Sequence, residues 1–238
     1  MKPNAKTLLL LLALLPLGVS ASTKVTDHDE IVTGEIPKPG HIWVYDFSAT
    51  ASDVPAQSAL AGQVAEHPTK QTDEQVATGR ELGAKIAAEL VSRIDAMGLP
   101  AARPTAGTQP AINDLVIRGH LVSMSEGDEK KRVLVGFGSG ESELQAFVEG
   151  FQMTPQGLRL LGKGDTDSTG GKTPGVGVGL LTTVATHNPI GLLVSTGIKV
   201  HEEKSGGGKL DGRAKDTAKK IADVLEERFK EQGWIDGN

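Results

Sequence analysis

The residues with the clearest potential for chemistry form the run D-T-D-S-T-G, which begins at Asp165. Asp165, Asp167 and Thr169 supply side-chain oxygens at alternate positions, and Gly170 follows where a calcium loop makes its sharp turn. The twelfth position of such a loop carries a bidentate glutamate, and here it is Val176. We therefore keep a calcium site at Asp165, Asp167 and Thr169 as a secondary hypothesis and expect an ordinary polar turn in this segment.

Other motifs with catalytic potential fail at a required position. The run G-G-K-T that starts at Gly170 resembles the end of a phosphate loop, but the glycine that the loop needs at position 166 is Thr166. The pair His201-Glu202 lacks the second histidine of a zinc-protease helix, since position 205 is Ser205. No G-x-S-x-G elbow presents a serine nucleophile. The sequence therefore predicts a protein that is not an enzyme and has no cofactor.

One segment stands out by composition. Positions 173–198 contain no Lys, Arg, Asp or Glu, and the motif His187-Asn188-Pro189 divides them into two arms. Each arm has about the length of a membrane β-strand, yet lacks the strict alternation of apolar and polar residues that such a strand shows. The candidate partner-binding residues are Val176, Val178, Leu180, Leu181, Ile190, Leu192 and Leu193.

Three interpretations of this tract remain open. It is a hairpin folded into the core of its own domain, with glycines that allow close backbone approach. Alternatively, it is an exposed apolar surface that binds another protein or a second copy. A third interpretation is insertion into a membrane, which would require several copies to close a barrel.

The amino-terminus has the three-part layout of a secretory signal peptide. Lys2 and Lys6 precede an apolar run, and Val19-Ser20-Ala21 places small residues at a cleavage site. The apolar run is shorter than the roughly 20 residues of a membrane helix, although an uncleaved anchor is the alternative. We expect cleavage near Ala21 and a periplasmic or secreted protein. Removal of the two lysines takes the net charge from −5 to −7, which argues against nucleic acid as a partner.

The remaining chain reads as one domain. We expect a signal peptide over 1–21, an extended lead-in over 22–40 and a single domain over 41–238 that includes the glycine-rich insert 170–200. The absence of cysteine excludes both a lipid-bearing cysteine and disulfides. Residues 41–47 predict a central strand, with Trp43, Tyr45 and Phe47 on one face. That aromatic face is expected in the core, and a stacking platform for sugars or bases is the alternative.

Two amphipathic helices are expected. Thr72 with Gln75 fits a capping box, and Gly98 fits a left-handed stop with Leu99 folded back. The first helix presents its apolar stripe through Val76, Gly83, Ile86, Leu90, Ile94 and Met97. Asp211 is expected to cap the second helix, which presents Ala214, Ala218, Ile221, Leu225 and Phe229 and ends at Gly233, before Trp234.

Between the helices the period changes to that of strands. Strands are expected over 112–124, 132–138 and 141–153 and from 158 onward, with a turn at Thr154-Pro155-Gln156-Gly157. Short turns between successive strands favour an antiparallel meander. The predicted class is α+β, with a mainly antiparallel sheet packed against two amphipathic helices, plus a glycine-rich apolar hairpin.

The meander region also resembles a known family. The runs D-L-V-I-R-G-H-L from Asp114, E-G-D from Glu126, with Arg132 after it, and G-F-G-S-G-E-S-E-L from Gly136, together with the closing Q-G-W-I from Gln232, are similar to the bacterial family "domain of unknown function 4410". The resemblance implies an exported envelope protein and transfers no catalytic residues.

Our leading hypothesis is a non-enzymatic exported envelope accessory protein that binds another envelope component or self-associates through its glycine-rich apolar tract, with possible membrane contact. The alternatives are an oligomeric membrane-associated or pore-forming assembly, and a calcium-dependent binding protein or unidentified enzyme.

Overall fold

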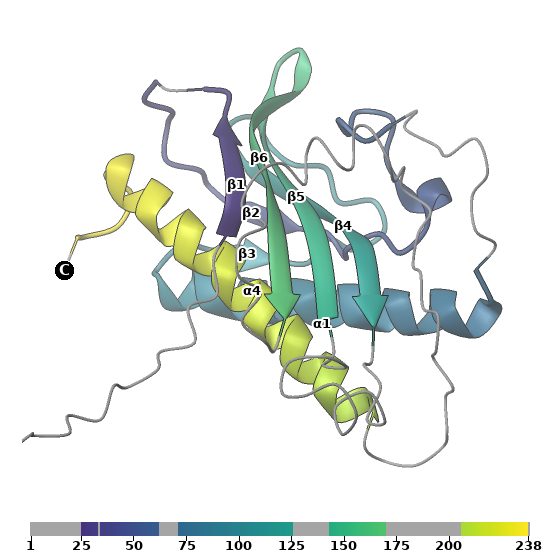
Figure 1. Ribbon diagram of the computed structural model, residues 1–238. Coiled ribbons are helices and arrows are strands. Elements are labelled where there is room, and N and C mark those ends of the chain that lie inside the picture. The colour runs from purple at the N-terminus through teal and green to yellow at the C-terminus, as the bar shows by residue number, and fades with distance from the viewer. Residues whose placement is uncertain (1–24, 33, 62–70, 126–142, 170–205, 238) are drawn as a thin grey trace, which may run out of the picture.

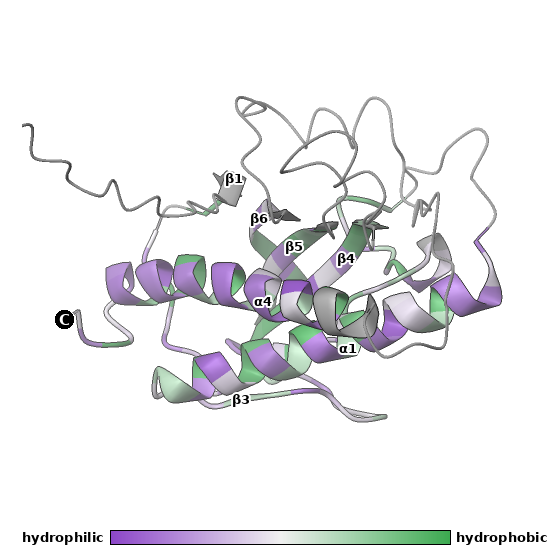
Figure 2. Cartoon of the chain, turned by 60° about the horizontal axis from the view of Figure 1, so that its bottom comes forward, coloured by the Kyte–Doolittle hydropathy of each residue, from purple (hydrophilic) through white to green (hydrophobic). Residues whose placement is uncertain are grey.

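The computed structural model describes residues 25–32, 34–61, 71–125, 143–169 and 206–237. These residues form a six-stranded sheet with two long helices side by side on one of its faces (Figures 1 and 2). The strand order is β1-β6-β5-β4-β2-β3. The strands are β1 (Val25–Glu30), β2 (Ile42–Val44), β3 (Ala101–Ala102), β4 (Leu115–Ser125), β5 (Glu143–Thr154) and β6 (Gly157–Thr169), and the helices are η1 (Ala51–Asp53), α1 (Asp73–Ala96) and α4 (Gly206–Glu231).

One half of the sheet is antiparallel. β4 pairs with β5, β5 with β6 and β6 with β1. The turn predicted at 154–157 joins β5 to β6, and Gly157 adopts a positive φ of 110° that a side chain would disfavour. β1 lies within 22–40, which the sequence predicts as an extended lead-in, and it pairs with β6 at the edge of the sheet. β6 runs to Thr169, so the polar turn expected at Asp165 is instead part of a strand.

The other half is parallel, because β2 pairs with both β3 and β4 in parallel. The 24-residue helix α1 lies between β2 and β3 along the chain, and such a crossover returns the chain to the same end of the sheet. The α+β class with two helices is thus confirmed, whereas the sheet is mixed rather than an antiparallel meander throughout. The expected strand at 132–138 and the hairpin of insert 170–200 lie outside the described residues.

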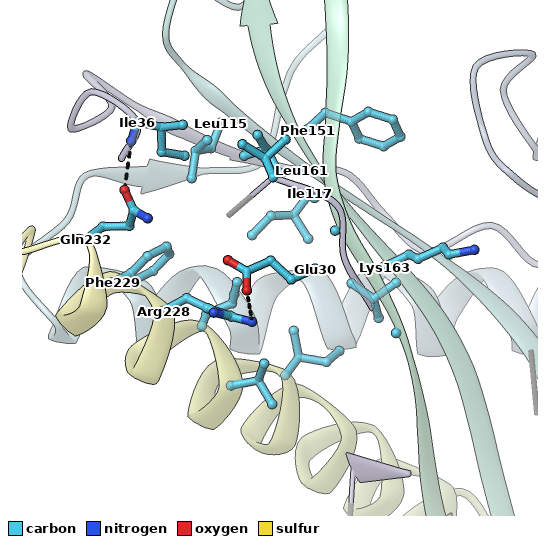
Figure 3. Close-up of a pocket in the computed structure, with 18 of the residues that line it drawn as sticks. Glu30, Ile36, Leu115, Ile117, Phe151, Leu161, Lys163, Arg228, Phe229 and Gln232 are labelled. Atoms are coloured by element: carbon cyan, nitrogen blue, oxygen red, sulfur yellow. Dashed lines mark hydrogen bonds and ion pairs between the residues drawn. The ribbon is translucent and has the colours of Figure 1, made fainter. Parts of the chain in front are cut away.

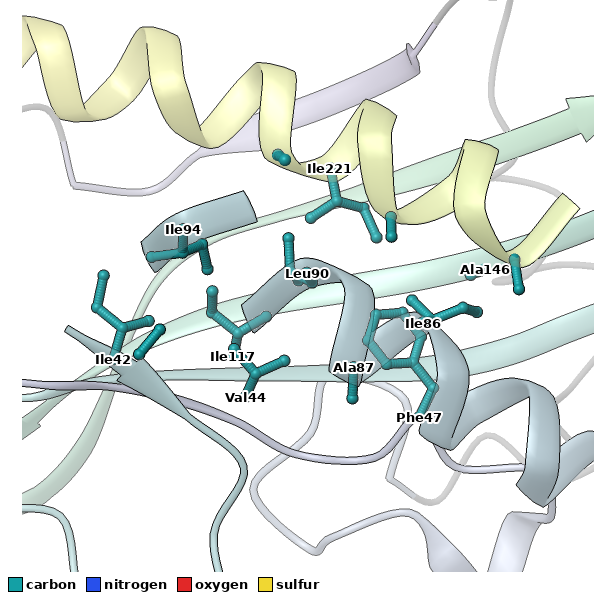
Figure 4. Packing of buried hydrophobic residues seen from close by; sticks show 14 of the residues in the cluster. Ile42, Val44, Phe47, Ile86, Ala87, Leu90, Ile94, Ile117, Ala146 and Ile221 are labelled. Atoms are coloured by element: carbon teal, nitrogen blue, oxygen red, sulfur yellow. The ribbon is translucent and has the colours of Figure 1, made fainter. Parts of the chain in front are cut away.

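The main core fills the space between the helices and the sheet (Figure 4). Thr72 and Gln75 form the predicted capping box, and Gly98 has a φ of 84°. Leu99 folds back so that its N–H donates to the carbonyl of Ile94. Of the apolar stripe predicted for α1, Gly83, Ile86, Leu90 and Ile94 are buried.

Helix α4 is longer than predicted. It begins at Gly206, and Asp211 lies inside it, where the carboxylate accepts a hydrogen bond of 2.6 Å from Lys85 of α1. Asp211 therefore joins α4 to α1 and does not cap the helix as predicted. Its end matches the prediction, since Gly233 has a positive φ and Trp234 is buried.

The prediction that the aromatic residues of 41–47 lie in the core is confirmed for Phe47 and wrong for Trp43 and Tyr45. Ile42 and Val44 are fully buried beneath the helices, while Trp43 and Tyr45 on the other face are only half-buried. Trp43 donates its indole N–H to Asp114 at 2.9 Å. The chain then bends, and Phe47 enters the core beneath α1.

Candidate functional site

A cavity of about 190 Å³ lies between the sheet and the carboxyl-terminal half of α4 (Figure 3). Its floor comes from β4, β5 and β6, one wall from α4, and its cover from the chain between Glu30 and Ile36. Most of the lining is apolar. The apolar side chains include Leu115, Ile117, Val148, Phe151, Leu161, Ile221, Val224, Leu225, Phe229 and Trp234.

Glycines create the hollow in the floor. Gly150 is the register partner of Gly162, and Val148 is the partner of Gly164, so Gly150, Gly162 and Gly164 share the face on which Val148 packs against the core. A Cβ atom built on Gly150 would have no heavy atom within 4 Å. Glycine weakens a strand and often marks a place that a ligand approaches closely. The three glycines therefore leave space where side chains would otherwise meet α4.

Hydrogen bonds join the segment that covers the cavity to the carboxyl-terminal end of α4 and the residues that follow it. The N–H of Ile36 donates to Gln232 at 2.8 Å, and the side-chain amide of Gln232 donates to the carbonyl of Gly34 at 3.3 Å. Trp234 donates its indole N–H to the carbonyl of Ile36 at 3.3 Å, while Lys38 donates to the carbonyl of Trp234 at 2.8 Å. These contacts hold a segment from the beginning of the described chain across the hollow.

One charged side chain at the edge of the cavity, that of Arg228, is paired with two carboxylates. Arg228 forms ion pairs with Glu30 at 2.9 Å and with Glu231 at 2.7 Å. Partial burial acts to lower the pKa of Arg228, but the two carboxylates outweigh it and the pKa is raised. A guanidinium held in its charged form cannot exchange protons near neutral pH, so it offers a fixed charge and no acid–base chemistry.

A second polar cluster lies on the opposite face of the sheet. Ser58 donates its hydroxyl to Glu149 at 2.6 Å, and the N–H of Ala59 donates to the other carboxylate oxygen at 2.7 Å. The Nε2 atom of His120 lies 3.3 Å from the Ser58 hydroxyl and 3.4 Å from Glu149. Ser58, His120 and Glu149 are 6 %, 1 % and 0 % exposed. These contacts hold the loop that contains Ser58 against β4 and β5.

This cluster has the residue types of a hydrolase triad but not its geometry. In a triad the carboxylate holds Nδ1 of the histidine and leaves the serine to Nε2. Here Glu149 contacts both Ser58 and Nε2, and the buried Nδ1 of His120 has no hydrogen-bond partner among the described residues. Burial acts to raise the pKa of Glu149, but hydrogen bonds from His120, Ser58 and Ala59 outweigh it and the pKa is lowered. The Glu149 carboxylate is buried and stays ionised, which is consistent with a structural role.

The sequence predicted neither the cavity beneath α4 nor the cluster of Ser58, His120 and Glu149. The signal for the cavity was Gly162-x-Gly164, because glycines two apart in a strand leave one face bare. The signal for the cluster was His120 and Glu149, which stand in the middle of strands rich in apolar residues.

The predicted calcium ligands do not share a loop. Asp165, Asp167 and Thr169 lie at alternate positions of strand β6, where the backbone is extended. Across the described parts of the chain, no group of three or more His, Cys, Asp or Glu residues is placed to hold a metal ion. The partner-binding candidates from Val176 to Leu193 lie outside the described residues. Neither described helix is long and apolar enough to span a membrane.

Among the comparisons with known proteins, the family model is the one that agrees with the family resemblance. Among solved structures, the PelC dodecamer from Paraburkholderia phytofirmans is similar at 9 % identity with a TM-score of 0.40, over 84 % of this chain and 94 % of that one. The hypothetical protein CT253 from Chlamydia trachomatis is similar at 10 % identity with a TM-score of 0.37, over 79 % and 96 %. No curated protein matches. The model of the family described as "Domain of unknown function (DUF4410)" matches residues 42–186, which is 145 of the 238 residues, and the chain belongs to that family.

Proposed function

We propose that this protein is a non-enzymatic accessory protein of the bacterial envelope that binds an apolar group of another envelope component. The observation that carries the proposal is the cavity beneath α4, whose apolar lining and bare glycine floor resemble the concave, mainly apolar sites that bind ligands. Strand glycines lower stability, and a binding site gives a reason for three of them on one face.

The polar groups that could do chemistry support binding over catalysis. Arg228 is paired with two carboxylates. Ser58 and Glu149 are buried against each other. A catalytic group must reach a reacting atom of its substrate, and Ser58 and Glu149 are only 6 % and 0 % exposed.

The proposed compartment depends on the amino-terminal sequence. Lys2, Lys6 and the apolar run before Ala21 match a signal peptide, and the absence of cysteine suits either a reduced or an oxidising compartment. The glycine-rich tract between Val176 and Leu193 offers a second contact surface in this proposal, for the same partner or for self-association. Deletion of 175–197 should then abolish capture of the partner while unfolding stays cooperative. Loss of the fold would instead assign the tract to the core.

The proposal is tested by photo-crosslinking in intact cells. Ile31 is 51 % exposed, and its N–H donates to the carbonyl of Leu161, which lines the cavity. A photoreactive residue at Ile31 should therefore crosslink to the bound component. Ile31 lies between Glu30 and Val32, which both line the cavity, whereas Ile112 is 59 % exposed and neither of its neighbours, Ala111 and Asn113, is part of the lining; Ile112 is therefore the matched control. We expect an adduct from Ile31 in the periplasmic fraction and none from Ile112. Equal labelling at the two positions, or a cytosolic protein, would refute the proposal.

A further inference from the structure

The lining of the cavity extends along both β6 and α4. Its lining on β6 runs from Leu161 to Thr166, a distance of about 16 Å at about 3.3 Å per residue. On α4 it runs from Ile221 to Phe229, about 12 Å at about 1.5 Å per residue. For comparison, a compact apolar cavity of about 150 Å³ holds one benzene ring. A volume of about 190 Å³ spread over this length leaves a channel in place of a round chamber.

The floor and wall suit a flexible chain of uniform width. Gly162 and Gly164 lie two residues apart on one face of β6, and Gly150 of β5 is the register partner of Gly162, so this part of the floor is bare backbone. Ile221, Val224, Leu225 and Phe229 follow one another at spacings of one to four residues along α4 and form an apolar wall. A flexible alkyl chain can follow this strip of backbone, and the volume of about 190 Å³ limits the bulk of any ring system that could enter instead.

The charges around the channel do not select a charged head group. The ionisable residues of the lining are two acids, Glu30 and Asp165, and two bases, Lys163 and Arg228. Their formal charges cancel, so the lining as a whole gives little net attraction to an anion or a cation. Selectivity must then come from the apolar part of the ligand.

We propose that the cavity is a binding site for one unbranched alkyl chain, such as the acyl chain of a single-chain amphiphile. This inference rests on the proposed function and specifies the apolar group that is bound. The chain lies along Gly162 and Gly164 beneath α4, and the head group remains outside, near the Glu30–Arg228 pair.

The test is a calorimetric titration of the mature protein with a homologous series of alkyl sulfates and alkyl maltosides, from hexyl to dodecyl, below their micellar concentrations. Affinity should rise about fourfold with each added methylene until the chain fills the channel, and then level off. Both head groups should give the same plateau length. Affinity that follows head-group charge, or that does not depend on chain length, would overturn the inference.

Two variants locate the binding. Gly150→Leu places a side chain in the open space above Gly150 and should weaken binding of the longest chain at least tenfold. Gly212→Leu, at an exposed helical glycine that also has no neighbour within 4 Å, should leave binding unchanged. If Gly150→Leu fails to fold, Val224→Phe narrows the channel from the helix side and should give the same loss. Unchanged affinity in the folded variant would contradict the inference.

A failure of the alkyl-chain inference can be distinguished from a failure of the proposed function, because the titration tests the first and the crosslinking tests the second. An Ile31 adduct to a polypeptide, with no alkyl binding in the titration, would leave the accessory role standing and refute the alkyl chain. Alkyl binding without any adduct in cells would support the site and refute the accessory role.

Discussion

The Ser58 hydroxyl donates a hydrogen bond of 2.6 Å to the carboxylate of Glu149, and both side chains are buried between the sheet and the loop before α1. Strand β5 supplies the carboxylate, and the loop at residues 54–61 supplies the hydroxyl and the N–H of Ala59. Next to them, Leu60 packs against Phe147, with Val54 and Val122 alongside. A hydrogen-bonded charge and a small apolar cluster together fix this loop on the outer face.

Removal of the Ser58 hydroxyl should destabilise the fold. In Ser58→Ala the buried carboxylate of Glu149 loses its shortest hydrogen bond, which costs about 1–3 kcal/mol in the free energy of unfolding. Ser52→Ala is the control, because Ser52 is exposed and its hydroxyl shares a hydrogen bond with the exposed Thr50 hydroxyl. Chemical denaturation of both variants measures the difference. Equal midpoints for Ser58→Ala and Ser52→Ala would contradict the structural role.

Stability should fall in acid through Glu149. Its pKa in the folded protein is lowered from an ordinary value of 4.5. The carboxylate therefore stabilises the fold fully above pH 4.5, and this contribution is lost as the pH falls below 4.5 toward the folded value. Glu149→Gln should be less stable than the parent at neutral pH, and the gap should shrink in acid. Unfolding free energies measured between pH 3 and 7 test this, and a constant gap would exclude Glu149 as the group responsible.

The close approach of Phe47 to two glycines should make both intolerant of alanine. A Cβ on Gly83 would overlap the backbone carbonyl of Phe47, and a Cβ on Gly119 would overlap its ring. Overpacking of this kind costs about 1–3 kcal/mol. Gly212→Ala should have the opposite sign, with a gain of up to about 1 kcal/mol, because it lies in an exposed helix with open space around it. Thermal unfolding of the three variants measures whether each substitution lowers or raises the stability. A Gly83→Ala variant as stable as the parent would contradict the close packing of Phe47 on Gly83.

Calcium should not stabilise the protein. The hypothesis requires Asp165, Asp167 and Thr169 to surround one ion, and on an extended strand alternate residues are spread along the chain. We expect neither heat of binding nor a shift in Tm at millimolar calcium. A saturable shift that Asp167→Asn abolishes would restore the metal site.

Local signals predicted a large part of the fold. The capping box at Thr72, the stop at Gly98 and the turn before Gly157 are each determined by a few neighbouring residues, and all three are confirmed. The apolar stripes of both helices were also visible, because a helix that packs on a sheet repeats its buried positions every three to four residues.

The elements that depend on distant partners were not predictable. β1 has the sequence V-T-D-H-D-E, without apolar alternation, and it is a strand because β6 offers an edge for pairing. Parallel pairing of β2 depends on the path of the chain through α1. The cavity was not predictable either, because it forms where α4 packs over Gly162 and Gly164 of β6, which are distant from α4 in sequence.

The central claim, that an alkyl chain occupies the channel beneath α4, is tested most directly by nuclear magnetic resonance. Mature protein with labelled methyl groups, saturated with decyl maltoside, should show intermolecular nuclear Overhauser effects from the chain to Val148, Leu161, Val224 and Leu225, which line the cavity. Effects confined to Leu60 and Val122 on the opposite face, or none at saturation, would contradict it.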